Sequence, residues 1–165
     1  ALTRYRDAIL HVHDAVVAGM NAGKDVFTLM REIRLPAELD VGEGYGNLIW
    51  SIRGIYEGYA VWFDGNPATM YDEPPAAVYP EAVSLAGGPE AISARAAVLL
   101  AEGEPVRALH LADMALAADA RHSGALEVRI AALESLRARS VNTNERGWLD
   151  HGIRTARQRL AATGD

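Results

Sequence analysis

The chain has 165 residues, is 50% hydrophobic, carries a formal net charge of −6 and contains no cysteine. That length suits one compact domain with a sizeable core, and the lack of cysteine excludes disulfides and thiolate metal sites. No apolar run approaches the roughly 20 residues of a membrane span, and no signal-peptide pattern opens the chain, so we expect a soluble protein without a membrane partner. Because it begins at Ala1, directly in helical sequence, we expect an excised part of a longer protein.

Charge is unevenly distributed along the chain. Residues 1–90 carry 6 basic and 13 acidic side chains, whereas residues 91–165 carry 10 and 9. No dense block of Lys and Arg with interleaved aromatics is present, which argues against nucleic acid as a partner. The arginine-rich end is predicted to be a solvated helix face; it comprises Arg137, Arg139, Arg146, Arg154, Arg157 and Arg159.

The first half reads as three helices. An apolar stripe with spacings of three and four predicts a first helix that Gly23 ends: Tyr5, Ile9, Val12, Val16 and Met20. Asp25 is expected to cap a second, shorter helix that Pro36 ends. Asn47 is expected to cap a third helix, whose apolar and aromatic side comprises Leu48, Ile52, Ile55, Tyr56, Tyr59, Trp62 and Phe63. The stretch FDGNP then breaks it, with Gly65 in a left-handed conformation.

The second half is rich in alanine and leucine and predicts five more helices, over residues 76–86, 90–102, 105–118, 124–139 and 143–162. Asn142 and Glu145 have the spacing of a capping box. Small residues in 94–136 resemble about one and a half tetratricopeptide repeats, too few for a separate solenoid, so we expect this part to pack onto the first. The predicted fold is therefore all-α: a helical bundle of one domain (1–165), with parts 1–72 and 73–165 and tetratricopeptide-like helix hairpins in the second.

The stretch HVHD at residues 11–14 raises the question of a zinc site. His-x-His grips one ion when the backbone is extended, but on a helix His11 and His13 lie about 200° apart. We therefore expect a partly buried, locally hydrogen-bonded His13 and a solvated His11, and no metal site in this chain.

The other candidate residues for catalysis or ligand binding are also expected to have structural roles. His110, His122 and His151 lie on separate helices without ligand spacing, so we expect surface or helix-end residues. The stretch GEGYG at 42–46 follows no strand and precedes no Lys-Ser/Thr pair, which favours a loop over a phosphate cradle. No catalytic residue is predicted.

Most of the aromatic residues gather in one short part of the chain: Tyr45, Trp50, Tyr56, Tyr59, Trp62 and Phe63. Two interpretations stay open. The rings form a bundle core, or some of them form a protein interface or line a neighbouring pocket.

Four stretches taken in order resemble a known family: YRDAILHVHDAVVAGMNAGKDV, LMREIRLP, YG…W…RGIYEGY and WFDGNP. They resemble the helical dimerisation domain of alkyl sulfatases of the metallo-β-lactamase fold, from about Ala1 to Ala68, and the second half looks like the rest of that domain. Val61 stands where a small residue is expected before the tryptophan, and GKDVFT replaces a Thr-Pro helix start.

This resemblance implies a bacterial enzyme in which a preceding domain binds two zinc ions and cleaves sulfate esters, while this domain joins two subunits. None of the zinc-ligand positions has a counterpart here, so no cofactor is assigned to this chain. The expected partners are a second copy and the adjoining catalytic domain. The candidate interface or pocket-wall residues are Met20, Tyr56, Tyr59, Trp62 and Phe63. The alternative function is a tetratricopeptide-like adaptor that binds proteins or peptides.

Overall fold

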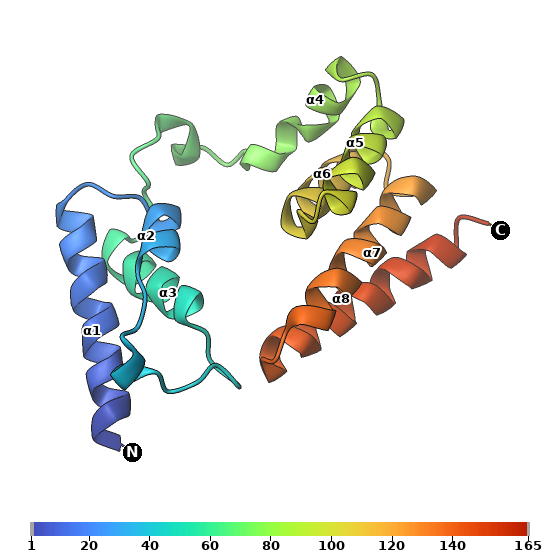
Figure 1. Ribbon diagram of the computed structural model, residues 1–165. Coiled ribbons are helices and arrows are strands. Elements are labelled where there is room, and N and C mark those ends of the chain that lie inside the picture. The colour runs from blue at the N-terminus through green and yellow to red at the C-terminus, as the bar shows by residue number, and fades with distance from the viewer. Residues whose placement is uncertain (1, 165) are drawn as a thin grey trace. The chain divides into compact units, whose positions relative to one another are not determined.

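The computed structural model describes residues 2–164, which divide into two compact units, the first ending at Met70 and the second beginning at Tyr71 (Figure 1). Within the described residues there are eight α-helices and three short 3-10 helices, and no strand. The predicted all-α class is thus confirmed. The tetratricopeptide-like character and the single domain spanning 1–165 stay predictions.

The first unit contains α1 (Leu2–Asn21), α2 (Val26–Glu32) and α3 (Leu48–Ala60), with the 3-10 helices η1 (Ala37–Leu39) and η2 (Pro67–Met70). Local chemistry sets these boundaries. The Asp25 carboxylate accepts the Thr28 amide at 3.0 Å, and the Asn47 side chain accepts the Ile49 amide at 2.9 Å. Both predicted N-caps are confirmed, because each side chain satisfies an amide that the first helical turn leaves unpaired.

The core of the first unit lies where the three α-helices meet. Its buried residues are Val12, Val16, Leu29, Ile33 and Ile52. A methyl group at Gly19 would collide with the Leu29 side chain, so this glycine lets α1 and α2 approach closely. Only the central and C-terminal parts of α1 contribute to this core, and Tyr5 and Ile9 remain more than half exposed.

Two predicted helices differ from the observed ones. The third was expected to include Trp62 and Phe63, but α3 ends at Ala60 because Val61 adopts a left-handed conformation with φ 54°. The helix expected over 76–86 is a 3-10 turn, η3 (Pro75–Val78), followed by α4 (Tyr79–Leu85). Pro80 explains the break, since proline is accommodated in the first turn of a helix and not in its interior.

The second unit continues with α5 (Pro89–Ala101), α6 (Pro105–Ala118), α7 (Ser123–Arg139) and α8 (Thr143–Ala161), and each packs against the next. These bounds agree with the predicted ranges to within one residue. Fully or nearly fully buried alanines allow close helix packing: Ala96, Ala108, Ala112, Ala115, Ala125, Ala132 and Ala156. None of the described helices has the combination of length and apolar character needed to cross a bilayer.

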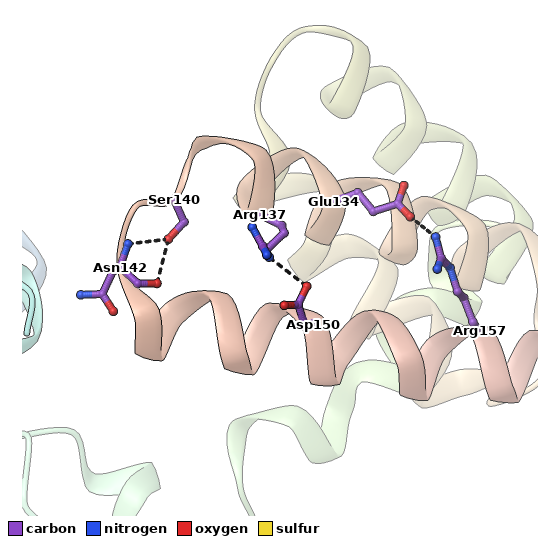
Figure 2. Close-up of polar contacts among 6 residues, drawn as sticks. All are labelled: Glu134, Arg137, Ser140, Asn142, Asp150 and Arg157. Atoms are coloured by element: carbon purple, nitrogen blue, oxygen red, sulfur yellow. Dashed lines mark hydrogen bonds and ion pairs between the residues drawn. The ribbon is translucent and has the colours of Figure 1, made fainter. Parts of the chain in front are cut away.

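Polar contacts join α7 to α8 (Figure 2). The Arg137 Nε lies 2.9 Å from an Asp150 carboxylate oxygen, and Arg157 pairs with Glu134. The arginine-rich face was predicted to be solvated, which agrees with the exposed Arg157, whereas Arg137 is only partly exposed because it packs beside Asp150 of the neighbouring helix. Since both pairs are partly exposed, each is expected to contribute only about 0.2–1 kcal/mol.

The turn between α7 and α8 is held by Ser140 and Asn142 (Figure 2). The Asn142 amide donates to the Ser140 hydroxyl at 3.2 Å, and the Asn142 side-chain oxygen accepts the Glu145 amide at 3.0 Å. The Asn142 half of the predicted capping box is therefore confirmed. Asn142 is buried, so its hydrogen bonds are shielded from competing water.

Candidate functional site

The exposed apolar residues concentrate on the first unit. Of the twenty-one large hydrophobic residues that are exposed among residues 2–164, fourteen lie at or before Met70 and seven after it, although the second unit is longer. Isolated exposed hydrophobics are ordinary, whereas a gathering of them indicates an interaction surface. Those on or beside α1 and α3 are Leu2, Tyr5, Ile9, Leu10, Ile49, Trp50, Tyr59, Val61, Trp62 and Phe63.

The most prominent group is an aromatic corner after α3, formed by Trp62 and Phe63. Their ring centroids lie 5.5 Å apart at an interplanar angle of 54°, and the residues are 71% and 42% exposed. Two rings in tilted contact form one apolar surface, and burying that surface against a partner is favourable. The corner therefore has the composition of an interface anchor.

Asp64 stabilises the turn that follows the aromatic corner. One of its carboxylate oxygens accepts the Asn66 amide at 2.9 Å and the Thr69 hydroxyl at 2.7 Å. The hydrogen bond from Thr69, and then that from the Asn66 amide, lower the pKa of the Asp64 carboxyl below its ordinary value, because both stabilise the ionised form. The turn that follows Trp62 and Phe63, from Asp64 to Thr69, is thus held by a charged side chain.

We expect the corner to loosen at acid pH. Since the pKa of Asp64 is lower in the folded state, its stabilising contribution is present above the unfolded pKa and is lost as the pH falls through the folded pKa. The measurement is Trp62 fluorescence against pH in a Trp50→Phe, Trp148→Phe background. Asp64→Asn should keep the acceptor oxygen and abolish the acid transition; a transition that survives this substitution would assign the pH dependence to another group.

Val61 is the strained residue of the corner. Among the described residues it is the one non-glycine with positive φ, at φ 54° and ψ −146°. A β-branched side chain is unfavourable there, and such conformations cost about 1–3 kcal/mol. The fold keeps this strained conformation directly before an exposed aromatic pair. This suggests that the backbone direction at Val61 is needed to place Trp62 and Phe63.

We expect Val61→Gly to raise the free energy of unfolding of the first unit by about 1 kcal/mol. Relief of strain should exceed the larger entropy that glycine brings to the unfolded chain. Val141→Gly is the matched control, because Val141 is 78% exposed but has no positive φ. Urea denaturation should show opposite signs for the two variants, and destabilisation by both would remove the strain argument.

A half-open hollow lies at the other end of α3. It has a volume of about 890 Å³, and its walls come from the N-terminal half of α1, the segment from Leu35 to Asn47, and the first turn of α3. The apolar lining comprises Tyr5, Ile9, Val12, Leu35, Val41 and Leu48. The hollow was not predicted from the sequence, although Tyr5 and Ile9 continue the apolar stripe of α1 beyond the core and were a usable signal.

The segment GEGYG forms part of the hollow's rim, and is a loop as predicted. Arg4 donates to the Asp40 carbonyl, the Gly42 amide donates to the Asp40 carboxylate at 2.9 Å, and the Leu48 amide donates to Glu43 at 2.8 Å. These bonds tie the segment to α1 and to the start of α3. Asp40 and Glu43 make the rim acidic, which disfavours a phosphate ligand.

The five predicted interface residues divide into two groups. Met20 and Tyr56 are half-buried and pack against the core, whereas Tyr59, Trp62 and Phe63 are exposed. The core interpretation of the aromatic set therefore holds for Tyr56. That these five residues take part in an interface stays a prediction.

The two histidines of HVHD have different partners. The His13 Nε2 lies 2.8 Å from the Tyr59 hydroxyl and its Nδ1 lies 2.9 Å from Asp14, so the partly buried, hydrogen-bonded His13 is confirmed. His11 was expected to be solvated, but it is half-buried with Nε2 3.2 Å from the Arg34 carbonyl, because the segment after α2 crosses this side of α1. The two imidazole rings thus contact different partners.

Other histidines are structural. His122 caps α7, with Nδ1 accepting the Ala125 amide at 3.1 Å and Nε2 3.1 Å from Glu90, as expected of a helix-end residue. His151 stacks edge-on with exposed Trp148, with ring centroids 5.9 Å apart. Among residues 2–164, no group of three or more His, Asp or Glu side chains is placed to hold a metal ion.

A shallow groove in the second unit bears on the adaptor alternative. It lies between α5 and α7 and is lined by Ala97, Leu100, Ala101, Glu127, Val128 and Ala131. A peptide-binding groove needs several polar anchors that fix the peptide's backbone and direction, and this lining contains only Glu127. The groove therefore gives the adaptor little support.

Comparison with known proteins relates this arrangement to one group of enzymes. The chain is 31% identical over 148 residues to the linear primary-alkylsulfatase of Pseudomonas sp. (strain ATCC 19151), covering 87% of the chain and 28% of that protein. It is 30% identical over 139 residues to an alkyl/aryl-sulfatase of Saccharomyces cerevisiae, covering 82% of the chain and 22% of that protein. The chain thus spans about a quarter of the length of these relatives.

A solved structure shares the fold. The stereoselective inverting sec-alkylsulfatase of a Pseudomonas species matches with a TM-score of 0.84 and 25% identity, over 94% of this chain and 25% of that one. The profile of the alkyl sulfatase dimerisation family matches residues 28–159, which is most of the chain. The chain therefore belongs to the alkyl sulfatase dimerisation family.

Proposed function

We propose that this chain is the homodimerisation and support domain of a zinc-dependent alkyl sulfatase whose metallo-β-lactamase catalytic domain lies outside it. The observation that supports this most directly is the gathering of exposed apolar residues on the first unit. In a twofold dimer one self-complementary patch is enough to pair two copies, and aromatic residues and methionine are enriched at such patches. Pairing would set the relative position of two catalytic domains.

Zinc belongs to this proposal only through the family resemblance of the sequence. When bound, zinc would activate a water molecule and polarise the sulfate ester in the catalytic domain. The residues described here do not fit it, because their imidazoles and carboxylates do not converge on one point. The role proposed for this chain is therefore mechanical support and pairing, with the adjoining catalytic domain as its second partner.

Sedimentation equilibrium over a wide concentration range, with zinc assayed on the same sample, tests the proposed function. A dimer without stoichiometric zinc is the expected result. A monomer at every concentration would contradict dimerisation by this chain, and stoichiometric zinc would contradict the division of labour between the domains.

A further inference from the structure

Two features of the first unit lie at opposite ends of α3 and complement each other. The hollow adjoins the N-terminal turn of α3, through Asn47, Leu48 and Ser51, and the aromatic corner follows its C-terminus at Ala60. A helix of 13 residues separates them, which at 1.5 Å per residue is about 20 Å. One feature is a hollow with an apolar lining and an acidic rim, and the other is a protruding pair of aromatic side chains that are 71% and 42% exposed.

We infer that two copies of this chain pair with their α3 helices antiparallel, and that each copy inserts Trp62 and Phe63 into the hollow of the other. This inference rests on the proposed homodimerisation and specifies its surface and geometry. The contact is reciprocal, because the corner of each copy meets the hollow of its partner, and such an arrangement closes after two copies.

The spacing of residues along α3 is consistent with this pairing. A twofold axis near Ile55 brings together positions equally far from it on either side. Trp62 of one copy then lies opposite Leu48 of the second copy, and Phe63 lies opposite Asn47 of the second copy; both opposing residues line the hollow. Because Trp62 and Phe63 follow the end of α3 at Ala60, this spacing sets the level at which the corner meets the hollow and not the direction of the two rings.

Charge supports the same register. Arg53 and Glu57 lie two residues on either side of Ile55, so each Arg53 faces the second copy's Glu57 across the axis. Within one copy they form an exposed ion pair of 2.6 Å and are 53% and 54% exposed. On pairing, each arginine would have carboxylates from both copies nearby, whereas a parallel arrangement about a twofold axis along the helices would place like charges opposite each other.

The outward face of α3 also lets another helix approach. Gly54 and Gly58 are exposed, and a Cβ atom built on either would meet no other atom within 4 Å. These positions do not define a site by themselves. Beside the corner and the hollow, however, they remove side chains that would hold two helices apart.

The available area suits a specific dimer. A fully buried aromatic side chain covers about 150–250 Å², so the exposed parts of Trp62 and Phe63 supply roughly 200 Å² per copy, and the walls that they cover supply about as much again. Two reciprocal sites then amount to roughly 800 Å². The faces of two α3 helices supply the remainder of the about 1,200 Å² that stable interfaces bury.

The test uses the absence of native cysteine. Positions 49 and 61 face each other across the same axis, and Ile49 and Val61 are 39% and 69% exposed. Within one copy they lie about 18 Å apart, beyond the reach of a disulfide, which needs Cα atoms within about 7 Å. An Ile49→Cys, Val61→Cys double variant should therefore give a covalent dimer on mild oxidation, while either single variant should not.

The controls separate this inference from the proposed function. A Leu85→Cys, Val141→Cys double variant, exposed in the second unit, should stay uncrosslinked under the same conditions. Crosslinking by Val61→Cys alone would overturn the antiparallel geometry. A chain that sediments as a dimer while the 49/61 pair stays uncrosslinked would leave dimerisation standing and refute this surface; a monomer throughout would refute both.

A second measurement tests whether Trp62 is buried in the dimer interface. Trp62→Ala should raise the dissociation constant of the dimer at least about 30-fold, as expected of a buried aromatic hot spot, and Trp148→Ala, at a tryptophan of similar exposure, should change it less than about 3-fold. Circular dichroism should show unchanged helix content in both. An unchanged dissociation constant for Trp62→Ala would refute insertion of the corner, and an unfolded Trp62→Ala would make it a core residue instead.

Discussion

Replacing Ile52 with alanine is expected to lower the free energy of unfolding of the first unit by about 3 kcal/mol. Ile52 is completely buried on α3 and packs in the cluster that contains Val12, Val16 and Leu29. Truncation removes apolar contacts and leaves a cavity where three helices meet, which the surrounding side chains fill only in part. In a small unit with few buried large residues, this loss is a large share of the total stability.

Native-state hydrogen exchange in increasing urea, resolved by peptide, measures this effect for α3 separately from α8. Ile49→Ala is the matched control on the same helix, since Ile49 is 39% exposed and should cost less than half as much. Ile52→Val, which removes one methyl group, should fall in between at about 1 kcal/mol. Equal losses for Ile52→Ala and Ile49→Ala would contradict the position of this core.

In the second unit, Leu126→Ala is expected to have an effect of similar size, about 3 kcal/mol. Leu126 on α7 is completely buried, in a cluster with Leu116 and the alanines at 115, 125 and 156. Leu116 and the partly buried Ile92, Ile130 and Leu160 also pack in this cluster, beside the small alanines. These neighbours should fill the cavity only in part, which places the cost in the middle of the range for such substitutions.

The same exchange experiment, read at α7 and α8, checks this prediction. Leu85→Ala provides the control, because Leu85 is 90% exposed at the end of α4 and should change stability by no more than about 0.5 kcal/mol. If Leu126→Ala proved as mild as this control, the second unit would have to repack around the cavity, contrary to the close helix contacts described above.

Much of the helical architecture could be predicted from local signals. Asp25, Asn47 and Asn142 cap helices because a side-chain oxygen reaches an amide two or three residues away, and that geometry depends on neighbouring residues only. Pro89 and Pro105 begin helices for an equally local reason. The failures, at Val61 and before Tyr79, are places where a residue that breaks or restarts a helix was read as part of its interior.

The candidate site could be predicted only in part. The sequence indicated that the aromatic residues near α3 matter, but left open whether they form core or surface. Tyr56 turned out to be half-buried and Trp62 mostly exposed, although both were placed on one helical side. The reason is that α3 ends at Ala60, so the periodicity of the helix no longer determines where Trp62 and Phe63 lie.

The sequence by itself determined the all-helical class, the helix caps and the resemblance to the alkyl sulfatase dimerisation family, since each depends on residue types at short spacing. Only the tertiary structure decided that Tyr5 and Ile9 line a hollow, that His11 is half-buried beside Arg34, and that Trp62 and Phe63 stay uncovered. Exposure depends on which distant segments pack against a residue. Those long-range contacts are set by the fold of the whole unit, and a local pattern does not contain them.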